Sequence, residues 1–188
     1  MKPKTVVVIA GLPTTGKTSL GLALAERLGI HFVDIDAGPA LCAPPQEANP
    51  YRSDEARARA RARMTVAYTT MHGAVEANIT QGFSVIVSAT YSRYSNQDFF
   101  MAAVERAGGA RVKVLWCQYH DTEEEVARRI DDRLAKSAAG GCRTVAHYFD
   151  DKGRYAGIKL PHLVVMMEGG DEGVERAIKQ ALAYINAD

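Results

Sequence analysis

The sequence predicts an α/β fold, with a five-stranded, mainly parallel sheet that is covered by helices on both faces. Two observations support this fold class. Five short apolar runs alternate with segments in which apolar residues recur at spacings of three and four. The runs are typical of strands that are buried on both faces, and the spacings are typical of amphipathic helices. Strands that alternate with helices favour parallel pairing through right-handed crossovers.

The expected elements follow one another along most of the chain. We expect strands at about 6–10, 30–36, 83–88, 112–117 and 162–167, and helices at about 19–28, 53–81, 96–107, 121–134 and 171–185. Ser53 resembles a helix cap, and Asp121 with Glu124 three residues on resembles a capping box. The periodicity of the long helix after Ser53 predicts that it buries Met64, Tyr68, Met71, Val75 and Ile79.

Residues 136–158 carry no periodic pattern and begin with small residues and glycines. We expect a mobile lid there, within a single domain that spans residues 1–188. The formal net charge of +1 gives no strong field for nucleic acid or for a membrane surface. No apolar run reaches the roughly 18 residues that a transmembrane helix needs. Three widely separated cysteines fit a reducing, cytoplasmic location.

A glycine-rich stretch between the first strand and the first helix has the spacing G-x-x-x-x-G-K-[ST]. Glycines let successive backbone N–H groups face inward, and the helix N-terminus adds partial positive charge. Such a loop binds nucleotide phosphates: Lys17 would reach the β- and γ-phosphates, and the Thr18 hydroxyl would hold Mg²⁺. The predicted nucleotide site consists of Gly11, Thr14, Thr15, Gly16, Lys17, Thr18 and Ser19.

Two acidic residues, Asp34 and Asp36, follow on the second expected strand and lie on the same side of it. Ligands of parallel sheets bind at the carboxyl ends of the strands, so these carboxylates are expected beside the phosphate loop. Asp36 is the candidate general base that orients an acceptor hydroxyl and takes its proton. Asp34 is the alternative base, or a ligand of a Mg²⁺-bound water. Both could also be solvated strand-end carboxylates.

Two classes of nucleotide-binding protein are disfavoured by what the chain lacks. Motor and transporter ATPases carry an acid at the end of a second apolar strand, but here Val85-Ile86-Val87 is followed by Ser88. The guanine-reading stretch Asn-Lys-x-Asp of GTPases does not occur in the sequence. A small chain with an acid after its second strand and arginines late in the chain fits phosphoryl transfer, which needs positioned charges rather than covalent help.

The chain resembles the small P-loop kinases, a group that includes predicted AAA-type kinases, polynucleotide kinase, gluconate kinase, chloramphenicol phosphotransferase and zeta toxins. The resemblance rests on the phosphate loop, Asp36, the run 81–91 and the run 125–134, and it covers nearly the whole chain. It implies a P-loop NTPase fold like that of nucleoside-monophosphate kinases, and ATP- and Mg²⁺-dependent phosphorylation of a hydroxyl. It also implies that Arg129 stacks on adenine and that Arg133 contacts phosphates. Relatives often have Asp where Ser88 stands.

Residues near the other strand ends are candidates for binding the acceptor. Arg52 and Arg93 could bind an acidic acceptor, and Tyr91 could stack on an acceptor ring or simply pack. Four arginines at alternate positions, 57 to 63, spread around their helix and are expected to form a solvated face.

Three functions follow, and the sequence leaves them open. The first is a kinase of a small molecule. The second is a kinase of a nucleoside monophosphate or a polynucleotide 5′-hydroxyl, which the near-neutral charge disfavours. The third is an ATP-binding regulatory module without catalysis, which the serine at position 88 would explain. The identity of the acceptor and the oligomeric state are not readable from the sequence.

Overall fold

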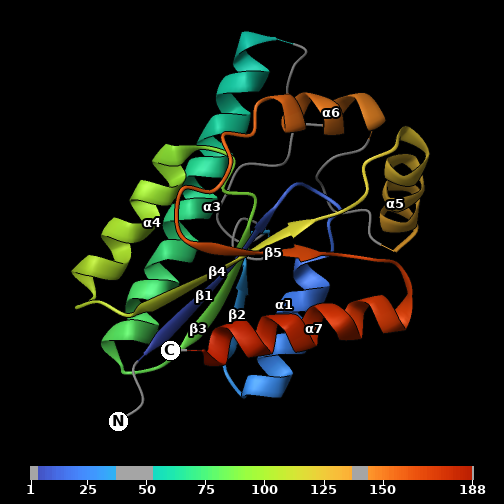
Figure 1. Ribbon diagram of the computed structural model, residues 1–188. Coiled ribbons are helices and arrows are strands. Elements are labelled where there is room, and N and C mark those ends of the chain that lie inside the picture. Colours follow the sequence, from blue (N-terminus) through green and yellow to red (C-terminus); the bar gives the residue numbers. More distant parts are fainter. Residues whose placement is uncertain (1–3, 37–52, 137–143, 188) are drawn as a thin grey trace.

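A five-stranded parallel sheet forms the centre of the molecule (Figure 1). This computed structural model describes residues 4–36, 53–136 and 144–187. The strands lie in the order β2-β3-β1-β4-β5, and every neighbouring pair is parallel. They are β1 (Thr5–Gly11), β2 (His31–Asp34), β3 (Val85–Ala89), β4 (Arg111–Gln118) and β5 (His162–Met166). The predicted α/β class is confirmed, and the sheet is parallel throughout.

Helices cover both faces of this sheet. α3 (Asp54–Thr80) and α4 (Tyr94–Arg106) pack on one face, while α1 (Lys17–Leu28) and α7 (Gly170–Asn186) pack on the other. α5 (Glu123–Lys136) and α6 (Val145–Gly153) contact each other above the carboxyl edge of the sheet. The helix α6 lies inside the segment that the sequence left without a pattern.

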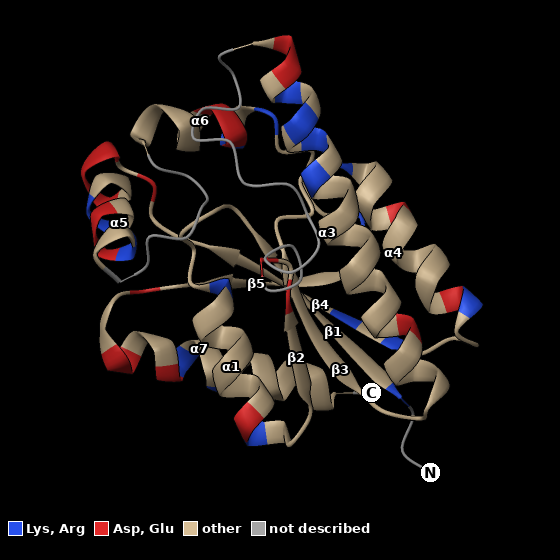
Figure 2. Ribbon diagram, turned by 180° about the vertical axis from the view of Figure 1, so that it is seen from behind, with Lys and Arg blue, Asp and Glu red and all other residues tan. Residues whose placement is uncertain are grey.

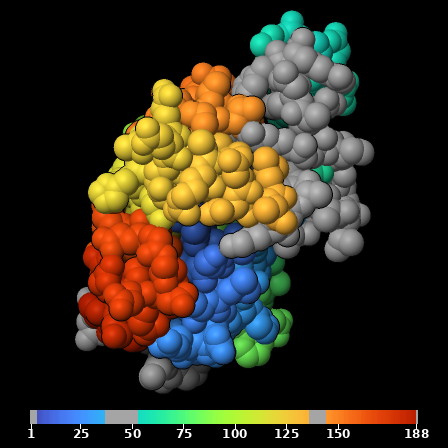
Figure 3. All heavy atoms as spheres, turned by 90° about the vertical axis from the view of Figure 1, so that its right-hand side faces the viewer, coloured from blue at the N-terminus to red at the C-terminus, as the bar shows by residue number. Residues whose placement is uncertain are grey.

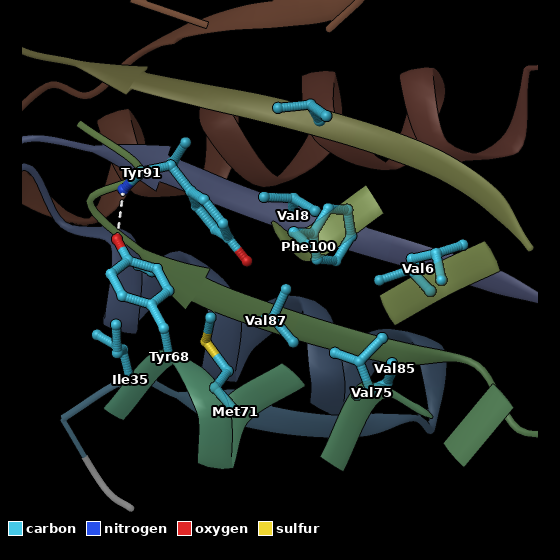
Figure 4. Packing of buried hydrophobic residues seen from close by; sticks show 14 of the residues in the cluster. Val6, Val8, Ile35, Tyr68, Met71, Val75, Val85, Val87, Tyr91 and Phe100 are labelled. Carbon is cyan, nitrogen blue, oxygen red and sulfur yellow. Dashed lines mark hydrogen bonds between the residues drawn. The ribbon is translucent and has the colours of Figure 1, made fainter. Parts of the chain in front are cut away.

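Successive side chains of β1 point to opposite faces of the sheet and belong to two halves of the core. Val6, Val8 and Ala10 face α3 and α4, whereas Val7 and Ile9 face α1 and α7. Figure 4 shows the first half, in which side chains of α3 and α4 converge on the valines of β1 and β3. All of these strand residues are at most 3% exposed, which is why β1 is the rigid base from which the phosphate loop emerges.

Two local predictions were wrong for identifiable reasons. Met64 is 43% exposed, because the N-terminal half of α3 extends beyond the sheet while the other four predicted core residues of this helix are buried. The cap of α5 is Thr122 rather than Asp121: the Glu125 backbone N–H donates to Thr122 Oγ1 at 3.3 Å. Asp121 is left available for a tertiary role.

Candidate functional site

The carboxyl edge of the sheet brings together the ends of the first three strands. β1 ends at Gly11, β2 at Asp34 and β3 at Ala89. Because β3 lies between β2 and β1, Asp34 pairs with Ser88, and Ser88 pairs with Ile9. The parallel register therefore places Asp34, and with it Asp36 two residues beyond β2, near the start of the phosphate loop.

The loop has a backbone that only particular residues accommodate. Gly11 has φ +153°, and a Cβ there would lie 2.6 Å from the Cys117 carbonyl oxygen. Gly16 has φ +79°, and a Cβ there would lie 2.9 Å from Met167 Cε. Thr14 also adopts a positive φ of 63°. This succession of left-handed residues leads into α1, so N–H groups of the loop and the helix N-terminus together form a cradle that fits the phosphates of a nucleotide.

Lys17 begins α1, and its ammonium is held inside the loop. Its Nζ donates to the Leu12 carbonyl oxygen at 2.6 Å, and Thr15 Oγ1 donates to the same oxygen at 2.9 Å. Burial lowers the pKa of Lys17 from its ordinary 10.5 to about 8, although the Asp34 and Asp36 carboxylates act in the opposite direction. The ammonium group beside the cradle is thus poorly hydrated. Contact with a bound anion would therefore stabilise its charged form.

Oxygen atoms from two elements meet next to Lys17. Thr18 Oγ1 donates to Asp34 Oδ2 at 2.6 Å, and the Asp36 backbone N–H donates to Asp34 Oδ1 at 3.0 Å. Hydroxyl and carboxylate oxygens are the ligands that Mg²⁺ prefers. The pair Thr18 and Asp34 therefore has the chemistry that a magnesium ion with bound water requires. Ser19 is exposed in the first turn of α1.

The predicted base and the predicted phosphate-binding arginine lie next to each other. Arg133 Nη2 of α5 is 3.7 Å from Asp36 Oδ2. The pKa of Asp36 is raised, first by desolvation and then by the Asp34 charge, while Arg133, Lys17 and Arg63 act to lower it. The Asp36 side chain is nevertheless 77% exposed, so protein atoms surround the carboxylate on some sides while its surface stays open to an acceptor.

Arg129 lies away from these groups, in a buried network. Its Nη2 is 3.1 Å from Asp121 Oδ1, and its guanidinium lies over the Tyr119 ring at 4.2 Å from the centroid and over the Tyr148 ring at 5.5 Å. The side chain is only 6% exposed. The expected stacking on adenine would therefore require these rings to give way to the base.

The candidates for acceptor binding separate in the structure. Tyr91 is 1% exposed and packs among His72, Tyr68 and Phe100, so packing and not stacking on an acceptor is its role (Figure 4). Arg93 is exposed at the start of α4. Charges of Arg93 and Asp36 both act on the pKa of Tyr68, which burial raises to about 12. Arg52 lies outside the described residues.

Sequence reasoning missed the hub at Asp121. Its carboxylate accepts hydrogen bonds from Tyr148 Oη at 2.7 Å and from Arg129, and Lys152 Nζ is 2.9 Å from Oδ2. Desolvation raises the pKa of Asp121, but the bonds from Tyr148, Lys152 and Arg129 outweigh this and hold it below its usual value. Tyr148 and Lys152 lie in the segment without periodicity, so the sequence contained no indication of these partners. It indicated only that Asp121 lies next to the start of a helix.

Comparison with known proteins identifies the family. A family model of an AAA domain (AAA_33) matches residues 6–147. The chain belongs to this family. None of the helices within residues 4–36, 53–136 and 144–187 has the combined length and hydropathy of a membrane-spanning segment.

Solved structures share the fold of this AAA domain over nearly its whole length. A protein of Chloroflexus aurantiacus j-10-fl, provisionally assigned as a kinase, superposes with a TM-score of 0.74 at 17% identity, covering 98% of this chain and 100% of that chain. A gluconokinase of Sinorhizobium meliloti 1021 gives 0.63 at 19% identity, with 97% and 91% covered. The APS kinase CysC of Mycobacterium tuberculosis, solved with AMPPNP and APS, gives 0.64 at 17% identity, with 98% and 99% covered.

A curated relative matches only a short stretch. Shikimate kinase of Thermobifida fusca (strain YX) is 49% identical over 37 residues, which are 20% of this chain and 22% of that kinase. Together with the structures, this match shows that the chain has the fold of the P-loop kinases.

Proposed function

We propose that this AAA domain is an ATP-dependent phosphotransferase that moves the γ-phosphoryl group of ATP to a hydroxyl of a small molecule. The observation that carries the proposal is the contact of Asp36 with Arg133 next to Lys17. A base for the acceptor hydroxyl just beyond β2 and two cations for the phosphates, from α1 and α5, meet at one edge of the sheet. A nucleotide-binding loop alone would not need the base.

The transfer follows from these residues. Asp36 accepts the proton of the acceptor hydroxyl while the hydroxyl oxygen forms a bond to the γ-phosphorus and the bond to the bridging β–γ oxygen breaks, which leaves ADP. Lys17 and Arg133 stabilise the charge on the transferred group and on the departing phosphate. Arg133 lies on Asp36 in the structure, and binding of phosphates would draw it away.

Thr18 and Asp34 are the residues that would hold Mg²⁺, Thr18 through its hydroxyl and Asp34 through a bound water. When bound, the ion neutralises phosphate charge and orients the β- and γ-phosphates. The cradle of Gly11, Thr14, Thr15, Gly16 and Ser19 would bind the phosphates through its N–H groups and hydroxyls.

The cations around Asp36 favour an acceptor that itself carries negative charge. The charge of Arg63 of α3 acts on the Asp36 carboxylate, and Arg93 is exposed at the start of α4. Figure 2 shows the Lys and Arg positions along the N-terminal half of α3, and Arg63 is the half-buried member of the four arginines expected to be solvated. Gluconate, shikimate and adenosine 5′-phosphosulfate, suggested by the names of the similar kinases, are anions of this kind.

A second candidate is a nucleotide-binding module without catalysis, and Ser88 favours it. The side chain is 1% exposed, and within the described ranges its Oγ has no hydrogen-bond partner. An acid at this position would help to hold the magnesium shell, and serine is a weaker ligand. Tight ATP binding without transfer to any acceptor would support this candidate.

The test is phosphoryl transfer from radiolabelled ATP to a panel of hydroxy acids, matched neutral polyols, nucleoside monophosphates and 5′-hydroxyl oligonucleotides. Lys17→Ala and Asp36→Asn are each expected to lower kcat/KM by about 10²-fold or more, because each removes a charge or a base used in the transition state. Lys179→Ala, which truncates an exposed lysine of α7, is the matched control and keeps full activity. Normal turnover in Lys17→Ala, with its circular dichroism unchanged, would refute the proposal.

A further inference from the structure

Leu12 makes two different kinds of contact. Its carbonyl oxygen accepts hydrogen bonds from Lys17 Nζ at 2.6 Å and from Thr15 Oγ1 at 2.9 Å. Its half-buried side chain packs against a separate apolar cluster whose buried members are Val126, Ile130 and Tyr148. One residue of the phosphate loop therefore joins the lysine of the loop to α5 and α6.

The two helices behind Leu12 are tied to each other. Asp121, just before α5, accepts a hydrogen bond from Tyr148 of α6 at 2.7 Å, and Lys152 of α6 is 2.9 Å from its other oxygen. Figure 3 shows atoms of α5 directly above those of the N-terminal segment that contains the loop and α1. Whatever displaces α5 at Leu12 therefore also displaces α6.

The position of α5 matters for the site because this helix carries Arg133. Its guanidinium is 3.7 Å from Asp36, whereas Ile130, one turn earlier, belongs to the cluster that touches Leu12. A shift of α5 on Leu12 changes the separation of Arg133 and Asp36.

We propose that Leu12 is a positioning residue that couples Lys17 to α5 and α6. This inference rests on the proposed function for one point, that phosphates bind at the loop. When phosphates draw Lys17 away from the Leu12 carbonyl oxygen, the backbone of Leu12 loses its charged hydrogen bond, and its side chain holds α5 and α6 less firmly. Arg133 is then released from Asp36 toward the phosphates. Such coupling is reciprocal, so the packing of α5 also sets the affinity of the loop for phosphate.

Amide hydrogen exchange of the full chain without nucleotide tests this, since Lys17→Met breaks the hydrogen bond and needs no ligand or acceptor. We expect exchange in α5 and α6 to become about threefold faster or more, both in Lys17→Met and in Leu12→Ala. The double variant should be no faster than Leu12→Ala alone, because both changes remove the same link. If Lys17→Met acted only by removing the lysine charge, the attraction of Arg133 to Asp36 would become stronger and exchange would slow. Faster exchange would therefore indicate the loss of the hydrogen bond between Lys17 and Leu12.

Two control variants separate coupling from general damage. Leu134→Ala truncates an exposed leucine of the same helix, and Thr18→Val removes the neighbouring hydrogen bond to Asp34; both should leave α6 exchange unchanged. Exchange of the β1 and β3 amides corrects for any change in global stability. Unchanged α6 exchange in Lys17→Met, or additive effects in the double variant, would overturn the proposal. Neither outcome bears on phosphotransfer, which the acceptor panel measures.

Discussion

At the scale of single residues, the burial of Lys17 makes nucleotide binding depend on pH. Its pKa of about 8 means that the side chain is charged before binding below pH 8 and largely neutral above it. Phosphates require the charged form, so above pH 8 binding must take up a proton. We expect the Kd for AMPPNP to rise by about 15-fold in total between pH 8 and 9.5.

Calorimetric titrations of AMPPNP at pH 7 and pH 9, in two buffers of different ionisation enthalpy, measure this proton uptake directly. Close to one proton is expected at pH 9 and little at pH 7. A flat affinity together with no uptake at pH 9 would show that Lys17 keeps its proton in the free protein.

Gly21 in α1 is a second position where a single residue decides the packing, because an added side chain would meet Phe32. A Cβ at this residue would lie 2.2 Å from Phe32 Cε2, so Gly21→Ala forces Phe32 out of the core half that α1 covers. We expect a loss of about 2 kcal/mol in the free energy of unfolding, measured by urea denaturation. Gly73→Ala is the control, because no atom outside the helix lies within 4 Å of its Cβ; it should gain about 0.5–1 kcal/mol. Equal effects of the two changes would contradict this packing.

At the scale of elements, the Asp121 hub holds α6 on α5. Asp121→Asn leaves the Arg129 guanidinium buried without its counter-charge, so we expect a loss of about 3 kcal/mol and early release of α6 in hydrogen exchange. Asp132→Asn removes the exposed ion pair with Arg128 on the same helix and should change stability by less than about 0.5 kcal/mol. Wild-type stability in Asp121→Asn would show that Arg129 has another partner.

The sign of the pH dependence follows from the same hub. The pKa of Asp121 lies below its usual value in the folded chain, so its contribution to stability is present above the unfolded value of 3.8 and is lost as the pH falls through the folded value. Near neutral pH this stabilisation is therefore complete.

The sequence predicted those features of the site that depend on residues close together in the chain. The phosphate loop is one continuous stretch, and its glycines are required by its own backbone, so its place and residues could be read directly. The proximity of Asp36 to the loop followed from the rule for parallel strands. The sequence could not show that Tyr91 is buried in the core, since this residue follows β3 with a positive φ of 51°, where the alternation of a strand no longer predicts the direction of a side chain. It also could not show that Asp121 pairs with α6, because that contact joins residues 27 apart.

At the scale of the whole molecule, the alternation of strands and helices predicted the class but not the order of the strands. β1 lies between β3 and β4, a placement that rests on strand pairing between residues about 80 and 106 positions apart in the chain. Once this order is known, the convergence of Gly11, Asp34 and Ser88 on one edge follows. The opposite edge of the sheet is left free of the residues proposed for phosphoryl transfer.

That opposite edge is where the two described ends of the chain meet. The Arg111 backbone N–H donates to the Lys4 carbonyl oxygen at 2.8 Å, and the Arg111 guanidinium donates to the carbonyl oxygens of Ile185 at 2.9 Å and Ala187 at 3.3 Å. A short linker could thus close the backbone into a circle at little entropic cost. A circular permutant that is joined there and opened at Gly108–Gly109, between α4 and β4, should keep the AMPPNP affinity of the parent. In this permutant the segments would be synthesised in a different order but would form the same architecture. The effect of the order of synthesis on folding could then be measured.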